Sequence, residues 1–269
     1  MTSIVTDETL NHIRDWLEAY AQQFMAMAPT AESRRAMMGL KLAHSRRVAA
    51  EARGLATELG WDTGDQNTAE ALGWLHDTGR FSQMAEFGTF RDAQSVNHAL
   101  RGHQVLSQVG ILRQCSAKRV RQILDSVLHH NVLRVPDDVH PDSVAFVRLI
   151  RDADKLDIIH VFSDAILHNR LTDYPEIVHR VDLNGPPSPE LVRELRAGHV
   201  PGYRLIRSLN DWKLVQVSWV YDLFYVPACR RVRARAVLPT LSNLLPNTPE
   251  IAAIIAAATA HLEGRCKPA

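Results

Sequence analysis

Two neighbouring residues, His76 and Asp77, have the side chains of a metal site. They stand at the end of an apolar helical run and are followed by a glycine and by Arg80. Adjacent side chains within a helix point in different directions, but at a helix end both can turn toward one point. A neutral imidazole nitrogen and a carboxylate oxygen are good ligands for a hard or borderline divalent metal. Because this dipeptide is common, its interpretation depends on the other histidines and acids of the chain.

Further side chains that can bind a metal lie on four other predicted helices. They are His44, His98, the pair His129-His130, and Asp154. Asp154 falls on an apolar stripe, where an unpaired carboxylate is costly and requires a metal or a basic partner. Successive members of the set are separated by about one helix plus a loop, so consecutive antiparallel helices would return each one to a similar depth. The ordered set therefore predicts a metal site inside a helical bundle.

Helices are predicted to position these residues, because apolar side chains recur at three-and-four spacing along most of the chain. The predicted helices cover residues 7–27, 31–59, 68–77, 97–109, 117–131, 142–168, 210–226 and 249–263. Residues 78–95 show no clear period and are predicted to form an ordered loop, with residues 81–92 beside the pocket. The sequence shows no credible strand ladder, so the predicted fold class is all-α.

The chain of 269 residues is long enough for one large domain or two small ones. We expect a single α-helical domain over residues 1–269. Residues 169–209 are rich in proline, glycine and charge, and they are predicted to be an insertion with a short helix over 188–197. Additional C-terminal helices are predicted over 210–264. We expect the insertion and these helices to shape the pocket or to form a homo-oligomer interface.

The composition is that of an ordinary globular protein, with 46% apolar and 23% charged residues. Lys and Arg number 31 against 30 Asp and Glu, which gives no electrostatic signal for nucleic acid or an anionic membrane. The N-terminal residues lack the pattern of a signal peptide, and no apolar stretch is long enough to span a membrane. Three widely spaced cysteines argue against a disulfide framework or a zinc-thiolate site. We therefore expect a cytoplasmic protein.

The order His44…His76-Asp77…Asp154 resembles the H…HD…D signature of the HD-domain superfamily of metal-dependent phosphohydrolases. The resemblance extends over about residues 36–165. It implies an HD-domain-like helical bundle whose core lies in that range, with the C-terminal helices as an addition to it.

Shorter elements are similar to particular branches of this superfamily. Residues 152–157 (DADKLD) look like the D-x-D-K/R-x-D segment of the dNTP triphosphohydrolase branch, in which the middle aspartate, here Asp154, is the metal ligand. Residues 98–102 (HALRG) are similar to the HPxxG element of the HD-GYP branch, and His129-His130 to its paired histidines. The chain has no GYP tripeptide and has alanine in place of the proline of HPxxG, which argues against a cyclic dinucleotide substrate.

The resemblance also implies the metal ligands. A first metal would be held by His44, His76, Asp77 and Asp154. In the binuclear branches the HD aspartate bridges to a second metal, held here by His98 and by His129 or His130; we assign His129 to the metal and His130 to the substrate. The mixture of His and Asp ligands favours Mn or Fe and leaves Mg, Ni and Zn open. A metal with open positions lowers the pKa of bound water to about 7, which makes hydroxide available for attack on phosphorus.

Basic and polar side chains near this site are candidates for binding a substrate phosphate group. Arg80 stands where related families have Lys or Arg, and Lys155 follows the last ligand as the phosphate-contacting lysine does in the triphosphohydrolase branch. With Asp77, these two residues form the predicted catalytic set. We place His103 and His130 with them among the predicted substrate-binding residues.

The predicted function is hydrolysis of a small phosphorylated molecule, either a phosphate ester or a nucleotide-type substrate. A di-iron HD-fold oxygenase is an alternative, because some HD-fold proteins use a ligand set of this kind to activate O2. A second alternative is a non-catalytic helical module whose histidines are structural. Metal content and phosphate release without O2 distinguish these three functions.

Overall fold

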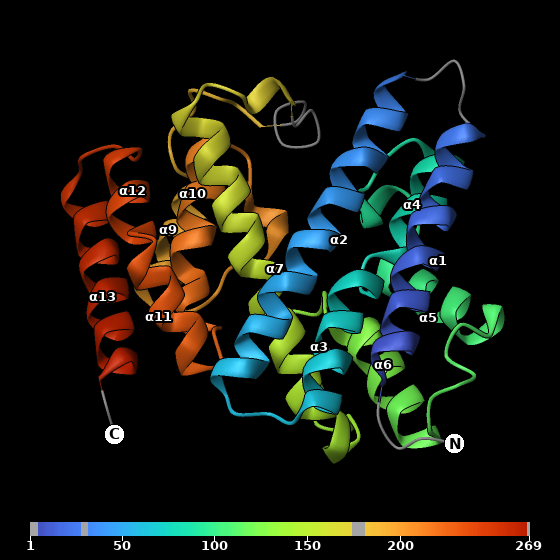
Figure 1. The fold of residues 1–269 in the computed structure, drawn as a ribbon. Helices are drawn as coiled ribbons and strands as arrows, with labels where there is room; N and C mark the ends of the chain where they lie inside the picture. Colours follow the sequence, from blue (N-terminus) through green and yellow to red (C-terminus); the bar gives the residue numbers. More distant parts are fainter. Residues whose placement is uncertain (1–4, 28–31, 174–180, 268–269) are drawn as a thin grey trace. The chain divides into compact units, whose positions relative to one another are not determined.

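The computed structural model describes residues 5–27, 32–173 and 181–267 (Figure 1). The predicted helix start at residue 31 and part of the predicted insertion, residues 174–180, lie outside the described residues. Within the described residues the regular structure is helical, apart from isolated bridge residues such as the parallel pair Asp182 and Ser208. The prediction of an all-α fold is confirmed.

The chain divides into two compact units, residues 1–157 and residues 158–269. The long helix α7 (Pro141–Leu167) contributes its first part to one unit and its last part to the other. The expected organisation as a single domain with an insertion stays a prediction. None of the helices in the described part of the chain combines the length and the apolarity needed to cross a bilayer.

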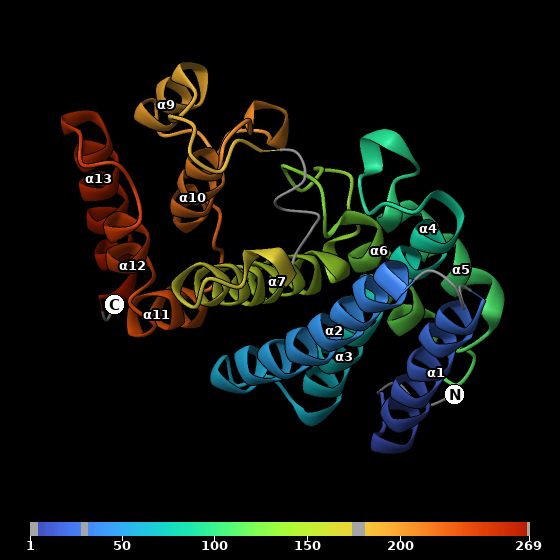
Figure 2. The same ribbon diagram turned by 90° about the horizontal axis from the view of Figure 1, so that it is seen from above.

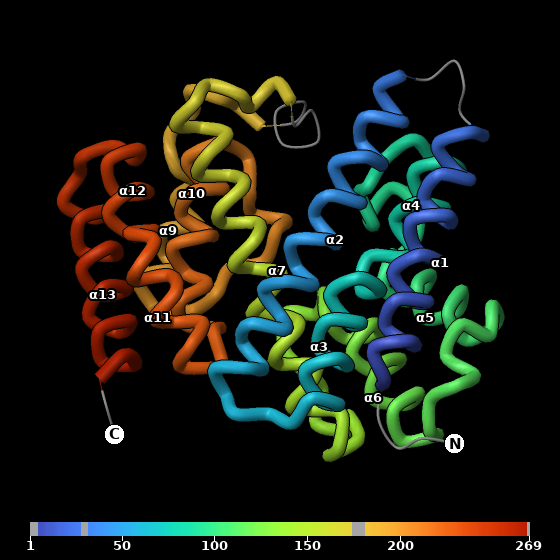
Figure 3. The backbone as a smooth tube through the Cα atoms, in the orientation of Figure 1, coloured from blue at the N-terminus to red at the C-terminus, as the bar shows by residue number. Residues whose placement is uncertain are grey.

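The first unit is built from consecutive helices whose buried faces meet. They are α1 (Asp7–Ala26), α2 (Glu32–Glu58), α3 (Thr63–Leu75), α4 (Thr78–Phe87), α5 (His98–Val109), α6 (Ala117–His129), the first part of α7, and the short 3-10 helix η1 (Asp92–Gln94). Helix α2 packs along α3, and α3 also contacts α1 and α6 (Figure 2). Helix α4 packs on α5, and α5 packs on α6 (Figure 3).

Two predicted boundaries in the first unit differ from the structure. Helix α3 begins earlier than predicted, because the side chain of Asp62 caps it by accepting a hydrogen bond from the backbone N–H of Asp65 at 2.8 Å. The prediction of a loop over residues 78–95 is wrong for residues 78–87, which form α4. Phe81 and Met84 are fully buried at helical spacing there, but two apolar residues among polar ones were too few to show a helical period in the sequence.

The close packing of α2 on α3 depends on Gly73. A Cβ atom at this position would lie 2.2 Å from the Cα atom and 2.3 Å from the backbone nitrogen of Ala49 on α2. Backbone atoms of a packed helix cannot move aside as a flexible side chain can, so any larger residue must push the two helices apart. This contact sets the distance between His44 on α2 and the end of α3.

Gly73→Ala is expected to destabilise the first unit by about 3 kcal/mol, because the added methyl group meets the backbone of α2. The matched control is Gly39→Ala, on α2, where no described residue outside that helix comes within 4 Å of the added methyl group. That change is expected to stabilise the helix by up to about 1 kcal/mol. Urea unfolding followed by circular dichroism measures both. Equal midpoints for the two variants would show that α2 and α3 do not pack this closely.

The second unit contains the end of α7 and the C-terminal helices. Those helices are α9 (Pro189–Arg196), α10 (Leu209–Ser218), α11 (Val226–Ala234), α12 (Val237–Asn243) and α13 (Pro249–Cys266), with 3-10 helices η2 (Leu171–Asp173), η3 (Tyr203–Leu205) and η4 (Trp219–Tyr221). The predicted helix 210–226 is shorter in the structure, and Pro227 stands in the first turn of α11, where its missing N–H costs nothing. The described part of the predicted insertion is fastened to α10 by the buried carboxylate of Asp211, which accepts hydrogen bonds from Ser188, Arg207 and Ser208.

Candidate metal centre

The junction of α3 and α4 turns His76 and Asp77 toward the same interior point. His76 is the C-terminal cap of α3, while Asp77 leaves helical geometry, with φ −100° and ψ 17°, before α4 begins. Both side chains are buried. The break between the helices is what allows two adjacent residues to face one centre, as the sequence predicted.

Helix α5 reaches this centre because two glycines let it approach α4. A Cβ atom on Gly79 would lie 2.1 Å from the carbonyl oxygen of His98 and 2.7 Å from the backbone nitrogen of Gly102. The first turn of α5, with His98 at its start, therefore lies directly against the residues that follow Asp77. Glycine is required here for close approach of two backbones, and this packing brings a third histidine to the site.

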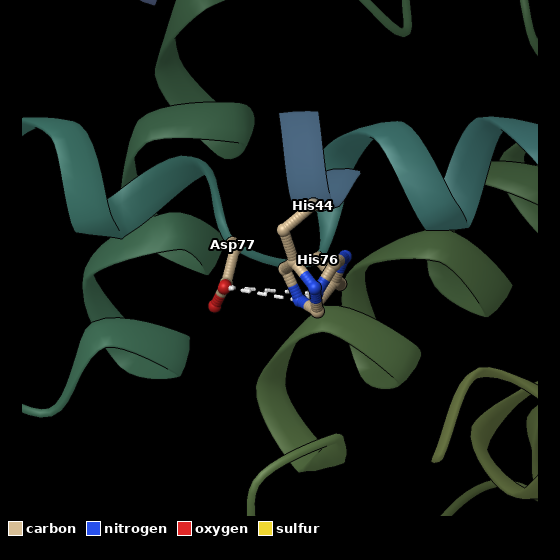
Figure 4. Close-up of side chains that lie close together, drawn as sticks. All are labelled: His44, His76 and Asp77. Atoms are coloured by element: carbon tan, nitrogen blue, oxygen red, sulfur yellow. Dashed lines mark hydrogen bonds and ion pairs between the residues drawn. The ribbon is translucent and has the colours of Figure 1, made fainter. Parts of the chain in front are cut away.

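The first group of possible ligands consists of His44, His76 and Asp77, whose ligand atoms all lie within 4.8 Å of one another. The Nε2 atoms of the two histidines are 3.2 Å apart, and each lies 3.7 Å from Oδ2 of Asp77. Figure 4 shows the two rings side by side, with the carboxylate of Asp77 turned toward them. Asp154 joins this group, because its Oδ1 atom lies 3.1 Å from Nε2 of His44.

The second group consists of Asp77, His98 and His130, again within 4.8 Å. The Nε2 atoms of the two histidines are 3.0 Å apart, and they lie 3.4 and 3.6 Å from Oδ1 of Asp77. Asp77 thus presents one carboxylate oxygen to each group. A carboxylate placed in this way can bridge two cations.

The outer nitrogen of each ring fixes which nitrogen faces the centre. Nδ1 donates a hydrogen bond to a carbonyl or carboxylate oxygen in every case, so a ring that carries one proton turns its unprotonated Nε2 inward. The acceptors are Asp157 for His44 (2.6 Å), Gly73 for His76 (2.9 Å), Asp92 for His98 (2.7 Å) and Val127 for His130 (2.8 Å).

This arrangement of lone pairs fits a bound cation. The Nε2 atoms face each other at 3.0 and 3.2 Å, and two unprotonated nitrogens at such a distance repel unless a proton or a metal ion lies between them. The buried Oδ1 atom of Asp154 faces Nε2 of His44 at 3.1 Å and has no other hydrogen-bond donor among the described residues, although buried acceptors in proteins are almost always satisfied. A divalent ion in each group would satisfy the nitrogens and this oxygen together. The donor set of the site therefore fits one or two divalent metals.

Two histidines at the centre, His76 and His98, are held in the form that binds a metal. Burial lowers the pKa of His76 to about 4 and that of His98 to about 3, so both rings are neutral at neutral pH. His44 differs, because Asp154 and Asp157 raise its pKa above the usual value in spite of burial and the charge of Lys41. Neutral imidazole is the ligand form of histidine, so His76 and His98 do not have to lose a proton when a metal binds at neutral pH.

The carboxylates at the centre stay ionised. Burial alone would raise the pKa of Asp77, but the positive charge of Lys41 and contacts with histidines hold it well below its usual range. Burial likewise opposes ionisation of Asp154, while His44 lowers its pKa. The pKa of Asp92 falls to about 2, because its contact with His98 outweighs burial. Negative charge is therefore present at the centre at neutral pH.

Chelator-treated protein is expected to lose stability as the pH falls. His76 and His98 have folded pKa values below those of the unfolded chain, so the unfolded state binds more protons from about pH 6.5 downward. His44 acts in the opposite direction, because its folded pKa is raised. The net free energy of unfolding should fall by about 2 kcal/mol between pH 7 and pH 5. Urea unfolding at both values measures it.

His98→Gln is the matched variant for this measurement, because it removes one titrating ring and keeps an amide of similar size. Its free energy of unfolding should depend less steeply on pH between 7 and 5 than that of the wild type. The same slope in both proteins would mean that His98 is not buried in its neutral form.

The structure places the two paired histidines differently from the expectation. The sequence analysis gave His129 to the metal and His130 to the substrate, but it is His130 whose ring lies in the second group. His130 continues the buried stripe of α6 through Ile123 and Val127, whereas His129 is half-buried and belongs to neither group among the described residues. The apolar but half-buried Val120, Leu124 and Leu128 suggested a different phase for this helix. The buried face of α6 therefore includes position 130 instead of position 129, which accounts for the difference.

The other predicted site residues lie in different surroundings. His103 is half-buried on α5 and belongs to neither metal group among the described residues, because five residues after His98 the helix has turned away. Lys155 is half-buried next to Asp154 on α7, and its contact with substrate stays a prediction. Arg80 lies beside the centre, with Nε 3.5 Å from Oδ1 of Asp77.

Arg80 also holds the segment that follows α4. Its Nη1 atom donates hydrogen bonds to Gln83 at 3.0 Å, to Asp92 at 3.1 Å and to the carbonyl oxygen of Phe90. Asp92 in turn binds His98, so Arg80 helps to fix one of the inward-facing rings. These contacts place Gln83, Phe90 and Asp92 next to Arg80, and the predicted role of residues 81–92 beside a pocket stays a prediction.

Three residues beside the centre were missed by the sequence analysis as participants. Asp157 and Asp92 accept the outer hydrogen bonds of His44 and His98, and Lys41 donates to Asp77 at 2.8 Å. Asp157 and Lys41 could have been found, because each stands three residues from a predicted ligand on its own helix. Asp92 gave no such signal, because it lies outside the long helices.

A family model described as HD domain matches residues 42–159. Comparison with curated proteins and with solved structures found no match. The matched range includes both groups of possible ligands, from His44 to Asp154. Proteins of this superfamily bind divalent metals, and most of them are metal-dependent phosphohydrolases. Residues 42–159 of this chain therefore match the HD-domain model and contain two adjoining clusters of side chains that can hold a metal.

Proposed function

We propose that this protein is a metal-dependent phosphohydrolase that cleaves a phosphate ester or a nucleotide-type substrate. The observation that supports the proposal most strongly is the placement of Asp77, which turns one oxygen toward each of two histidine pairs. Two divalent ions held in this way, when bound, supply activated water and neutralise charge on the attacked phosphoryl group. The first group would comprise His44, His76, Asp77 and Asp154, and the second Asp77, His98 and His130.

The residues around the ligands prepare the site for this reaction. Asp157, held by Arg47 at 2.6 Å, orients the ring of His44, and Asp92 orients that of His98. Arg80 fixes Asp92 and keeps a positive charge near Asp77. Preoriented ligands of this kind do not have to reorganise during turnover, which is how a rigid site lowers an activation barrier.

The test uses purified protein loaded with Mn under anaerobic conditions and screened for phosphate release across nucleotides and sugar phosphates. We expect metal at up to two equivalents per chain and release of phosphate from at least one class of compound. Asp154→Asn, which replaces a charged ligand with an amide of the same shape, should lose this activity while keeping its helix content.

The two alternatives give different results in the same experiment. Iron-dependent O2 consumption without anaerobic phosphate release would make the protein an oxygenase that uses this kind of ligand set. Absence of bound metal, together with wild-type properties of Asp154→Asn, would make the histidines structural. Either result would contradict the proposed function.

A further inference from the structure

Lys41 lies closer to the bridging carboxylate than the other basic side chains described above. It stands on α2 one turn before His44, and its Nζ atom donates a hydrogen bond to Oδ2 of Asp77 at 2.8 Å. This is the oxygen that faces His44 and His76. The ammonium group therefore lies at the first group of possible ligands rather than behind it.

The exposure of the side chains shows where the centre meets solvent. The side chains of His76, Asp77 and His130 are exposed by only 0%, 3% and 2%. Lys41 and Asp154 are exposed by 23% and 19%. Lys41 and Asp154 are therefore the most solvent-accessible side chains at the first group of possible ligands, and of these two only Lys41 attracts an anion.

Other basic side chains near the centre are engaged in holding the protein together. Arg80 binds the segment after α4, and Arg47 forms two hydrogen bonds with Asp157. Arg151 donates to the backbone carbonyl groups that follow α6, including that of His130 at 3.3 Å. Lys41 differs from these residues, because it donates a hydrogen bond to a ligand oxygen at 2.8 Å, whereas Arg80 approaches Oδ1 of Asp77 only to 3.5 Å.

A metal at the first group would compete with Lys41 for Oδ2 of Asp77. The ammonium group has three N–H donors, and at a partly buried position it needs a new acceptor once the carboxylate is shared with a cation. The ring of Phe90 lies 5.8 Å from Nζ and keeps the charge near the solvent-facing side through a cation–π contact. An anionic oxygen of a molecule that enters from solvent could accept the hydrogen bond that Lys41 then has free.

We propose that Lys41 binds an anionic phosphate oxygen of the substrate at the solvent-facing side of the metal centre. This inference rests on the proposed function for its choice of ligand. In this role Lys41 touches the substrate and helps to select phosphorylated molecules, while the metal ligands carry out the reaction. The rival role is structural, in which Lys41 only balances the charge of Asp77.

The experiment measures binding of inorganic phosphate to Mn-loaded protein by isothermal titration calorimetry, after free metal has been removed. Lys41→Met keeps the length of the side chain and removes its charge, and Lys41→Arg restores the charge. The matched control is Lys118→Met, which removes an exposed lysine on α6 that pairs with Asp142. Metal content of every variant is measured by elemental analysis.

We expect Lys41→Met to keep the wild-type metal content and to bind phosphate at least about tenfold more weakly, since the lost contact is charge-assisted. Lys41→Arg should recover part of the affinity, and Lys118→Met should match the wild type. On a hydrolysed substrate, Lys41→Met should raise KM more than it lowers kcat.

Unchanged phosphate affinity in Lys41→Met would overturn the proposal, as would absence of phosphate binding to the loaded wild type. Loss of metal from Lys41→Met would assign Lys41 to the support of Asp77 and would overturn it as well. A wild type that binds phosphate through Lys41 but hydrolyses no phosphate compound would contradict the proposed function alone.

Discussion

Asp77→Asn is expected to remove bound metal from both groups and to lower turnover by more than about 100-fold. Asp77 is the residue whose two oxygens face the two histidine pairs, so a neutral amide at this position weakens both groups at once. Its shape is nearly that of the carboxylate, and the helices around it should remain folded. Elemental analysis, turnover and circular dichroism measure the three properties.

Asp157→Asn is the matched control for this variant. The same chemical change is made there at a carboxylate that touches His44 from outside, at 2.6 Å from Nδ1. The expected loss is about 10- to 100-fold in metal affinity or activity, with both groups still able to bind. If Asp77→Asn instead kept two equivalents of metal and wild-type turnover, Asp77 would not be the bridging ligand.

His130→Ala is expected to reduce the metal content from two equivalents to one, while the adjacent His129→Ala keeps both. The ring of His130 lies 3.0 Å from that of His98 in the second group, and His129 is outside it. Because the two variants differ by one position at the end of the same helix, effects on helix stability should be similar. A loss of metal in His129→Ala, or none in His130→Ala, would reverse the assignment made from the structure.

Much of the site could be predicted because its ligands violate local patterns. Asp154 lies on an apolar stripe of its helix, and His76-Asp77 ends another apolar run. A charged or polar residue at such a position needs a partner, and the order of these positions along the chain suggested a shared one. The structure brings all of them to one centre, together with His44 and His98.

The phase of α6 could not be predicted from apolar residues alone. The buried side of this helix carries Arg119, Gln122 and Ser126, whereas several of its leucines are only half-buried. Two of these polar residues contact other helices: Arg119 pairs with Asp65 on α3 at 2.5 Å, and Gln122 donates a hydrogen bond to the carbonyl oxygen of Asp142 at 2.9 Å. Those contacts arise from tertiary packing, and no period in the sequence reports them.

The supporting residues were harder to predict for a related reason. Asp92 reaches His98 because Gly79 and Gly102 let α4 and α5 come together, and Arg80 then fixes the intervening segment. The loop expected over residues 78–95 could not show this arrangement. A glycine in the sequence does not indicate which other helix its backbone will contact.

X-ray absorption spectroscopy of the Mn-loaded protein tests the central claim most directly. The account predicts imidazole ligands on the metal, together with scattering from a second metal atom, and it predicts that Asp77→Asn removes the metal–metal scattering. Mn bound without imidazole ligands, or a second metal that remains in Asp77→Asn, would contradict it.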